Sequence, residues 1–240
     1  MRLGDFSVLT FDCYGTLIDW ETGIYEALRP WLERQGASAT REQILAAFAE
    51  AEAPQQAATP GLRYPELLAR VHSAMAARLG VAPDAEAAAA FGGSIADWPA
   101  FPDSAEALAY LGRHYQLVIL SNVDRASFAH SGRRLGVTFD AVYTAEDIGS
   151  YKPDPRNFEH MLAQLAARGV ARTQILHTAE SLYHDHLPAK RLGLATCWIH
   201  RRAGRSGHGA TRAPEVGVSP DFRFATLGEM AAAHRAETGA

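Results

Sequence analysis

Asp12 is the side chain of this sequence best placed to do chemistry. It follows the apolar stretch at residues 6–10, which predicts a β-strand, and it precedes the turn residues Gly15 and Thr16. A carboxylate at the carboxyl end of a strand lies where open α/β sheets bind their ligands. Such a group can act as a covalent nucleophile, which forms an ester with an electrophile that water then hydrolyses.

Three further segments place polar side chains in or after apolar runs. Ser121 and Asn122 end the predicted strand at residues 116–120. Lys152 stands in the turn-like segment 151–155, and an acidic loop follows the predicted strand at residues 174–178. Each segment alone is a weak signal, but four of them in order favour one shared site.

The four segments together resemble the motifs of the haloacid dehalogenase superfamily. Residues 12–17 read Asp-Cys-Tyr-Gly-Thr-Leu, and this run matches the first motif. Most members are phosphatases with a second Asp two residues after the nucleophile, and this chain has Tyr14 there. The branch with Tyr at this position is the L-2-haloacid dehalogenases, which expel a halide and so need no proton donor.

The resemblance implies a role for each matching residue. Asp12 would be the nucleophile, and Lys152 would keep it ionised and offset negative charge in the site. Asp185 would pair with Lys152 or position the hydrolytic water. Ser121 and Asn122 would hold the carboxylate of the substrate.

Three residues near the first motif are expected to complete the substrate site. Thr16 would bind the carboxylate network or cap the turn. Tyr14 would face the substrate, and Trp20, at the entry to the next helix, would line an apolar pocket or pack in the core.

The chain also departs from the dehalogenase pattern. Glu180 and Leu182 replace the Ser and Asn of the fourth motif, and Phe158 replaces a Tyr. The Arg that helps those enzymes to capture halide has only a weak candidate here, Arg63.

The carboxylate of Glu180 could bind a metal ion or a cationic group of a substrate. It matches a metal-binding acid of the phosphatases, so Asp12, Glu180 and Asp185 could hold Mg²⁺, although the dehalogenase resemblance implies no cofactor. Glu180 could instead bind an ammonium group on a substrate.

We therefore expect a hydrolase that displaces a leaving group at carbon 2 of a small carboxylic acid, first of all a halide of an (S)-2-haloacid. One alternative is the opening of a C–N bond in a cyclic imino acid by the same ester chemistry. A second alternative is a Mg²⁺-dependent phosphatase. A non-catalytic binding protein with this fold is a third.

The hydrophobic periodicity predicts an inserted helical lobe. Apolar residues spaced three and four apart predict helices, and Pro54, Pro60 and Gly61 predict a break at residues 53–61. The predicted helices cover residues 21–35, 41–52, 64–79 and 84–91. Residues 19–98 would then form a helical cap, and residues 1–18 and 99–240 an α/β core.

From residue 103 onward, predicted helices alternate with strands. Such alternation predicts a doubly wound parallel sheet, a Rossmann-like core with helices on both faces. Residues 202–220 hold several Gly and two Pro and are expected to form a mobile loop. Arg201, Arg202 and Arg205 are expected to be a solvated surface.

Composition limits the partners. With 240 residues, a net charge of −4 and no dense basic run, the chain is not expected to bind nucleic acid. The sequence shows no signal peptide, so export is not expected. It shows no apolar run of ~20 residues, so a membrane span is not expected either. Two cysteines fit a reducing compartment, so a cytoplasmic protein is expected, and the resemblance implies a possible homodimer. The spacing of His177, His184 and His186 does not predict a metal site.

Overall fold

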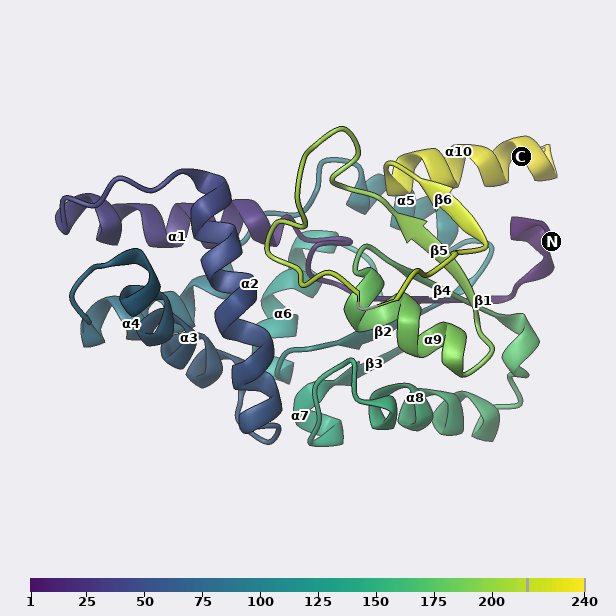
Figure 1. The fold of residues 1–240 in the computed structure, drawn as a ribbon. Helices are drawn as coiled ribbons and strands as arrows, with labels where there is room; N and C mark the ends of the chain where they lie inside the picture. The colour runs from purple at the N-terminus through teal and green to yellow at the C-terminus, as the bar shows by residue number, and fades with distance from the viewer. Residues whose placement is uncertain (215, 240) are drawn as a thin grey trace.

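The computed structural model describes residues 1–214 and 216–239 and shows one sheet of parallel strands (Figure 1). The strand order is β3-β2-β1-β4-β5-β6, and every neighbouring pair is parallel. The strands are β1 (Val8–Phe11), β2 (Gln116–Ser121), β3 (Ala141–Thr144), β4 (Ile175–Ala179), β5 (Ala195–Ile199) and β6 (Phe222–Phe224). The expected doubly wound α/β fold is confirmed, and it places β1, which ends before Asp12, between β2 and β4.

Helices cover both faces of this sheet because alternate strand residues point to opposite sides. Val8 and Val118 pack with α8 (Pro155–Ala167) and α9 (Leu187–Arg191), whereas Leu9 and Leu117 belong to the larger core that includes α5 and α10. The remaining core helices are α5 (Ser104–Leu111), α6 (Arg125–Leu135), α7 (Ala145–Ile148) and α10 (Leu227–Thr238). Both layers consist of buried apolar side chains, which fixes the sheet between them.

Four helices form a separate layer beside the sheet, on the left in Figure 1. They are α1 (Trp20–Arg34), α2 (Arg41–Ala58), α3 (Tyr64–Leu79) and α4 (Ala85–Gly93), followed by the short turn η2 (Ser94–Asp97). Their packed apolar faces include Trp31, Phe48 and Phe91. The boundaries of the cap at residues 19 and 98 stay a prediction.

The predicted break at residues 53–61 is confirmed only in its second part: α2 continues through Pro54 to Ala58, and the break between α2 and α3 lies at residues 59–63. Proline lacks the N–H that would bond the carbonyl four residues earlier, which normally ends or kinks a helix. Here that carbonyl, of Glu50, accepts a hydrogen bond of 3.5 Å from the Arg78 guanidinium of α3 instead. The longer helix carries Glu52 and Gln56 one turn apart on its buried face.

The arginines after β5 also differ from expectation. The side chains of Arg201 and Arg202 are only 6% and 7% exposed, so the predicted solvated surface holds for Arg205 alone. Both buried guanidinium groups have carboxylate partners, Asp103 for Arg201 and Glu21 for Arg202, which makes their burial possible. The loop at residues 202–220, of which Glu215 lies outside the described residues, packs partly against α1 through the N–H of Ala210, which donates to Glu21.

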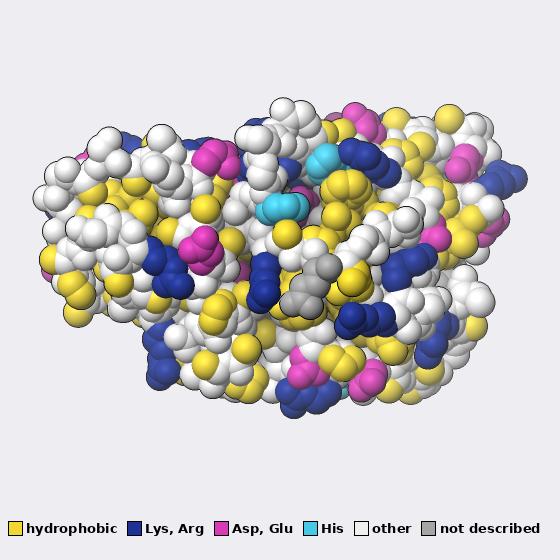
Figure 2. Space-filling view, in the orientation of Figure 1, with side chains coloured by type: hydrophobic (Ala, Val, Ile, Leu, Met, Phe, Trp, Pro, Cys, Tyr) yellow, Lys and Arg dark blue, Asp and Glu magenta, His cyan; other side chains and the backbone are white. Residues whose placement is uncertain are grey.

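The outer surface is mixed in character. Figure 2 shows that Lys and Arg side chains on this face are scattered among other types. In the described part of the chain, none of the helices has both the length and the apolar character that crossing a bilayer requires.

Candidate active site

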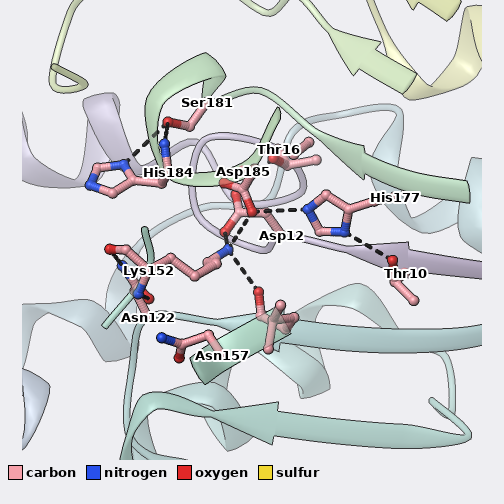
Figure 3. Close-up of polar contacts among 12 residues, drawn as sticks. Thr10, Asp12, Thr16, Asn122, Lys152, Asn157, His177, Ser181, His184 and Asp185 are labelled. Atoms are coloured by element: carbon pink, nitrogen blue, oxygen red, sulfur yellow. Dashed lines mark hydrogen bonds and ion pairs between the residues drawn. The ribbon is translucent and has the colours of Figure 1, made fainter. Parts of the chain in front are cut away.

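The four sequence segments meet at the carboxyl ends of the central strands (Figure 3). Asp12 follows β1, and Ser121 and Asn122 stand at the end of β2. Lys152 comes from the loop between α7 and α8, and Asp185 from a single π-helical turn, η4 (Leu182–His186), after β4. The parallel topology therefore brings these residues together although they are far apart in the sequence.

Lys152 is the centre of the site. Its ammonium group donates to Oδ1 of Asp12 at 3.0 Å, to Oδ1 of Asp185 at 2.6 Å and to the carbonyl of Leu120 at 2.8 Å. These bonds use all three of its protons. The hydroxyl of Thr16 donates to the other oxygen of Asp12 at 2.8 Å.

Burial and pairing separate the acidities of the two carboxyl groups. Burial raises the pKa of Asp12, and its attraction to Lys152 only partly offsets this. Burial also acts to raise the pKa of Asp185, but Lys152 and His177 hold it well below its usual range. Burial acts to lower the pKa of Lys152, but the two carboxylates together raise it. Asp185 is thus the stronger partner of the ammonium, which leaves Asp12 the more basic carboxylate.

His177 is a member of this network that the sequence analysis missed. Its Nε2–H donates to Oδ1 of Asp185 at 3.0 Å, and in the neutral ring the Thr10 hydroxyl donates to Nδ1 at 2.9 Å. Thr10 and His177 are register partners on β1 and β4. Two polar residues at matching positions of buried strands were the available signal. Phe158, one of the departures from the dehalogenase pattern, packs its ring edge-on against His177.

Asn122 and Ser121 have different surroundings. The amide of Asn122 donates to the Lys152 carbonyl at 2.9 Å and accepts from the Lys152 N–H at 2.7 Å, so it fixes the backbone that carries the lysine. The hydroxyl of Ser121 is buried and has no hydrogen-bond partner among the described residues. Asn122, and not Ser121, is among the residues that line the cavity at Asp12.

That cavity has a volume of about 30 Å³, which is room for roughly two or three water molecules. Helices α1, α2 and α3 contribute Trp20, Glu52, Gln56 and Tyr64 to its lining, and the rest of the chain contributes Asp12, Tyr14, Asn122, Val123, Lys152, Ser181, His184, Asp185 and Thr211. A ligand that fits here is small.

Trp20 depends on Gly15 for its place in this lining. Gly15 has a φ of +92°, and a Cβ atom there would lie 2.9 Å from Nε1 of Trp20. Only glycine meets both requirements, since side-chain-bearing residues rarely adopt this φ. The hydroxyl of Tyr14, whose ring also lines the cavity, is bonded to Ser131 of α6 at 2.7 Å.

Glu52 is the acidic residue that α2 places in the cavity, and the sequence analysis did not find it. Its side chain is buried, and Oε1 accepts a hydrogen bond of 2.6 Å from the Tyr64 hydroxyl. Burial raises the pKa of Glu52 to about 7. Arg63, the weak candidate for the halide-capturing arginine, is exposed and pairs with Glu66. Among the described residues that line the cavity, Lys152 is the single Lys or Arg.

Glu180 lies apart from this cavity. Its backbone N–H donates to Thr16, but the residue lines two other cavities, one of which includes Arg201 and Arg202. Burial and the nearby Glu21 raise the pKa of Glu180 to about 8. No group of three His, Cys, Asp or Glu among the described residues is arranged to hold a metal ion, so Asp12, Glu180 and Asp185 do not fit one.

A sequence model of the haloacid dehalogenase-like hydrolases matches residues 6–177. The chain belongs to this family of hydrolases. The matched segment includes Asp12, Asn122 and Lys152, which meet in the site described above.

Two solved structures are similar to this chain over nearly its whole length. The L-2-haloacid dehalogenase of Xanthobacter autotrophicus is 20% identical over 96% of this chain and 98% of that chain, with a TM-score of 0.73. The HAD-hydrolase YfnB from Bacillus subtilis, solved with magnesium, is 18% identical over 98% of this chain and 100% of that chain, with a TM-score of 0.76. At such identities the likeness shows the fold.

The pyrimidine 5′-nucleotidase YjjG of Escherichia coli is 27% identical over 92 residues, which is 38% of this chain. The match spans 36% of that relative, about a third of its length.

Proposed function

We propose that this hydrolase displaces a leaving group at carbon 2 of a small carboxylic acid through an ester of Asp12. The observation that carries the proposal is the arrangement of Asp12, Lys152 and Asp185 in the lining of one small cavity. Lys152 neutralises charge at the nucleophile, and the helical cap limits the access of water during attack.

The reaction has two half-reactions. In the first, an Asp12 oxygen attacks carbon 2 from the side opposite the leaving group, whose bond to that carbon breaks with inversion. In the second, water attacks the ester carbonyl of Asp12, which releases a 2-hydroxy acid. Lys152 and its partner Asp185 stabilise the charge that moves between these steps. No step requires a metal ion.

An (S)-2-haloacid is the first substrate to test. A halide leaves without a proton, which suits Tyr14 at the position where the family's phosphatases carry a second Asp. Asn122, one of the two residues expected to hold the substrate carboxylate, lines the cavity beside Asp12. The overall likeness to an L-2-haloacid dehalogenase supports the same choice.

A cyclic imino acid is the second candidate, and the acidic cap residue favours it. None of the described residues that line the cavity is an arginine that would capture a halide, and Glu52 could accept a hydrogen bond from a substrate ammonium. The ammonium partner expected from the sequence, Glu180, lines other cavities, so Glu52 replaces it in this candidate.

The test is halide release from L-2-chloropropionate, with and without EDTA, in the wild type and in Asp12→Asn. Release that survives EDTA and disappears in the variant is the expected result. Exposed Asp97→Asn is the matched control and should behave as the wild type. In water labelled with ¹⁸O, repeated turnover should place label in the carboxyl group of Asp12, because water attacks that carbonyl.

Two results would overturn the proposal. Turnover that leaves Asp12 unlabelled would rule out the ester. Hydrolysis of phosphate esters that requires Mg²⁺, with no turnover of any 2-substituted acid, would assign the chain to phosphatases, as the similarity to a nucleotidase suggests.

A further inference from the structure

The charges that line the cavity do not balance. Lys152 already serves two carboxylates, Asp12 and Asp185, at 3.0 and 2.6 Å. Glu52, on α2, adds a third carboxyl group to the lining. The helical side of the cavity therefore adds negative charge, and Lys152 stays the single Lys or Arg among the described lining residues.

Glu52 is held in place by packing and by one hydrogen bond. It lies on the buried face of α2 and is only 3% exposed, and the Tyr64 hydroxyl donates to it at 2.6 Å. In the described part of the chain no ion pair involves Glu52. A buried carboxylate without a cation is costly, so the site favours either a protonated Glu52 or a cationic ligand beside it.

The hydroxyl groups of the two tyrosines that line the cavity already have hydrogen-bond partners in the protein. The Tyr14 hydroxyl bonds Ser131 of α6, and the Tyr64 hydroxyl bonds Glu52 itself. Burial also raises the pKa of both phenols well above the usual range. Glu52 is therefore the group of the cap wall that can exchange a proton with a ligand.

We propose that Glu52 recognises a basic leaving group and shares one proton with it, so that the substrate class is a small acid whose carbon 2 bears an amine nitrogen. The inference rests on the proposed ester chemistry of Asp12 and names the leaving group for it. Tyr64 is a positioning residue that fixes the orientation of the Glu52 carboxyl group.

The proton balance is complete without a further reactant. Asp12 forms an ester bond to carbon 2 as the C–N bond breaks, and the electron pair of that bond moves to nitrogen. The nitrogen keeps the proton that it shares with Glu52. Water then attacks the Asp12 ester carbonyl. One proton of the water goes to the new hydroxyl group and the other to the released amine, and Asp12 and Glu52 return to their initial states.

The test compares Glu52→Gln with Glu50→Gln, a carboxylate of the same helix whose side chain is 70% exposed. The substrates are azetidine-2-carboxylate, a strained cyclic imino acid, and L-2-chloropropionate. Glu52→Gln should lower kcat/KM for the imino acid by about 10²-fold or more, the range that loss of a proton donor produces. The fall for the halide substrate should be much smaller, and Glu50→Gln should change neither. Equal falls for both substrates in Glu52→Gln would overturn the inference.

A binding measurement tests the inference independently of turnover. L-Proline and tetrahydrofuran-2-carboxylate have five-membered rings of similar size, but only proline carries a charged nitrogen. Calorimetry should show that the wild type prefers proline and that Glu52→Gln loses the preference while it still unfolds in one cooperative thermal transition. If the wild type binds both equally, Glu52 does not select an amine. If the preference exists but ¹⁸O never enters Asp12, the ester chemistry fails and the recognition by Glu52 stands.

Discussion

Lys152 is the residue through which the two carboxylates of the site are coupled. Its shorter bond goes to Asp185, which His177 also holds. Since Asp185 retains its charge most strongly, it fixes the ammonium of Lys152 and leaves Asp12 as the more basic partner. His177 therefore affects Asp12 through two intermediaries.

We expect His177→Asn to lower kcat strongly while KM changes little. The variant removes the bond from Nε2 to Asp185, so Asp185 and Lys152 lose their fixed positions beside Asp12. Displacement of a reacting group by about 1 Å costs on the order of 10²-fold in rate. Steady-state kinetics at a fixed pH measures this effect.

His186→Asn is the control for this experiment. His186 is equally buried, but its Nε2 bonds the carbonyl of Ala179 and not Asp185. If both variants reduce kcat alike, the loss reflects general disturbance of η4, and the network through His177 has no specific role.

The residues that the sequence revealed are those that stand at the ends of strands or in the segments that follow them. Asp12, Lys152 and Asp185 are recognisable because a parallel sheet gathers strand ends at one edge. His177 lies within β4, where a polar side chain looks like any core residue until its register partner Thr10 is known. Glu52 depends on tertiary packing of α2, which the local sequence does not encode.

At the scale of elements, Pro54 shows why the cap side of the site escaped prediction. Proline inside a helical pattern predicts a stop, and that prediction places Gln56 in a loop. The carbonyl that Pro54 leaves without a partner is satisfied by Arg78, from a helix that begins later in the chain. The continuation of α2, and with it the cavity wall, is a tertiary effect.

The loop after β5 joins the core to the cap through Arg202. Its guanidinium donates to Glu21 of α1 at 2.6 Å and to Glu42 of α2 at 2.9 Å. We expect Arg202→Gln to lower the free energy of unfolding by about 3 kcal/mol, because it leaves Glu21 as a buried carboxylate without its cation. Unfolding in urea measures the loss.

Two further variants make this prediction specific. The double variant Arg202→Gln with Glu21→Gln should be more stable than Arg202→Gln alone, since it removes the unpaired charge. Arg205→Gln, an exposed residue of the same loop, should change stability by no more than about 0.5 kcal/mol. A double variant that is less stable than the single one would contradict the role of Arg202 as partner of Glu21.

At the scale of the whole molecule, two histidines with lowered pKa values and two glutamic acids with raised pKa values determine how stability depends on pH. The pKa values of His184 and His186 are lowered to about 4, chiefly by burial. Those of Glu52 and Glu180 are raised to about 7 and about 8, again chiefly by burial. Unfolded His and Glu titrate near ~6.5 and ~4.3.

The signs follow from proton binding. Between pH about 4 and 6.5 the unfolded chain binds more protons at the two histidines, which favours higher stability as pH rises. Above about 4.3, and up to their folded pKa values, the two glutamic acids bind more protons in the folded chain, which has the opposite effect. The two trends oppose each other below pH ~6.5, and the glutamic acids alone act from there to about 8.

We therefore expect the melting temperature to be highest between pH about 5 and 6.5 and to fall from pH 6.5 to 8, as Glu52 and Glu180 lose protons in the folded state. Glu180→Gln should flatten this fall, because the amide does not titrate, and exposed Glu106→Gln should leave it unchanged. Thermal unfolding followed by circular dichroism at intervals of pH measures both curves. A wild-type melting temperature that rises from pH 6.5 to 8 would mean that these carboxyl groups are charged in the folded protein, and the cavity at Asp12 would then need a cation beside Glu52 even without substrate.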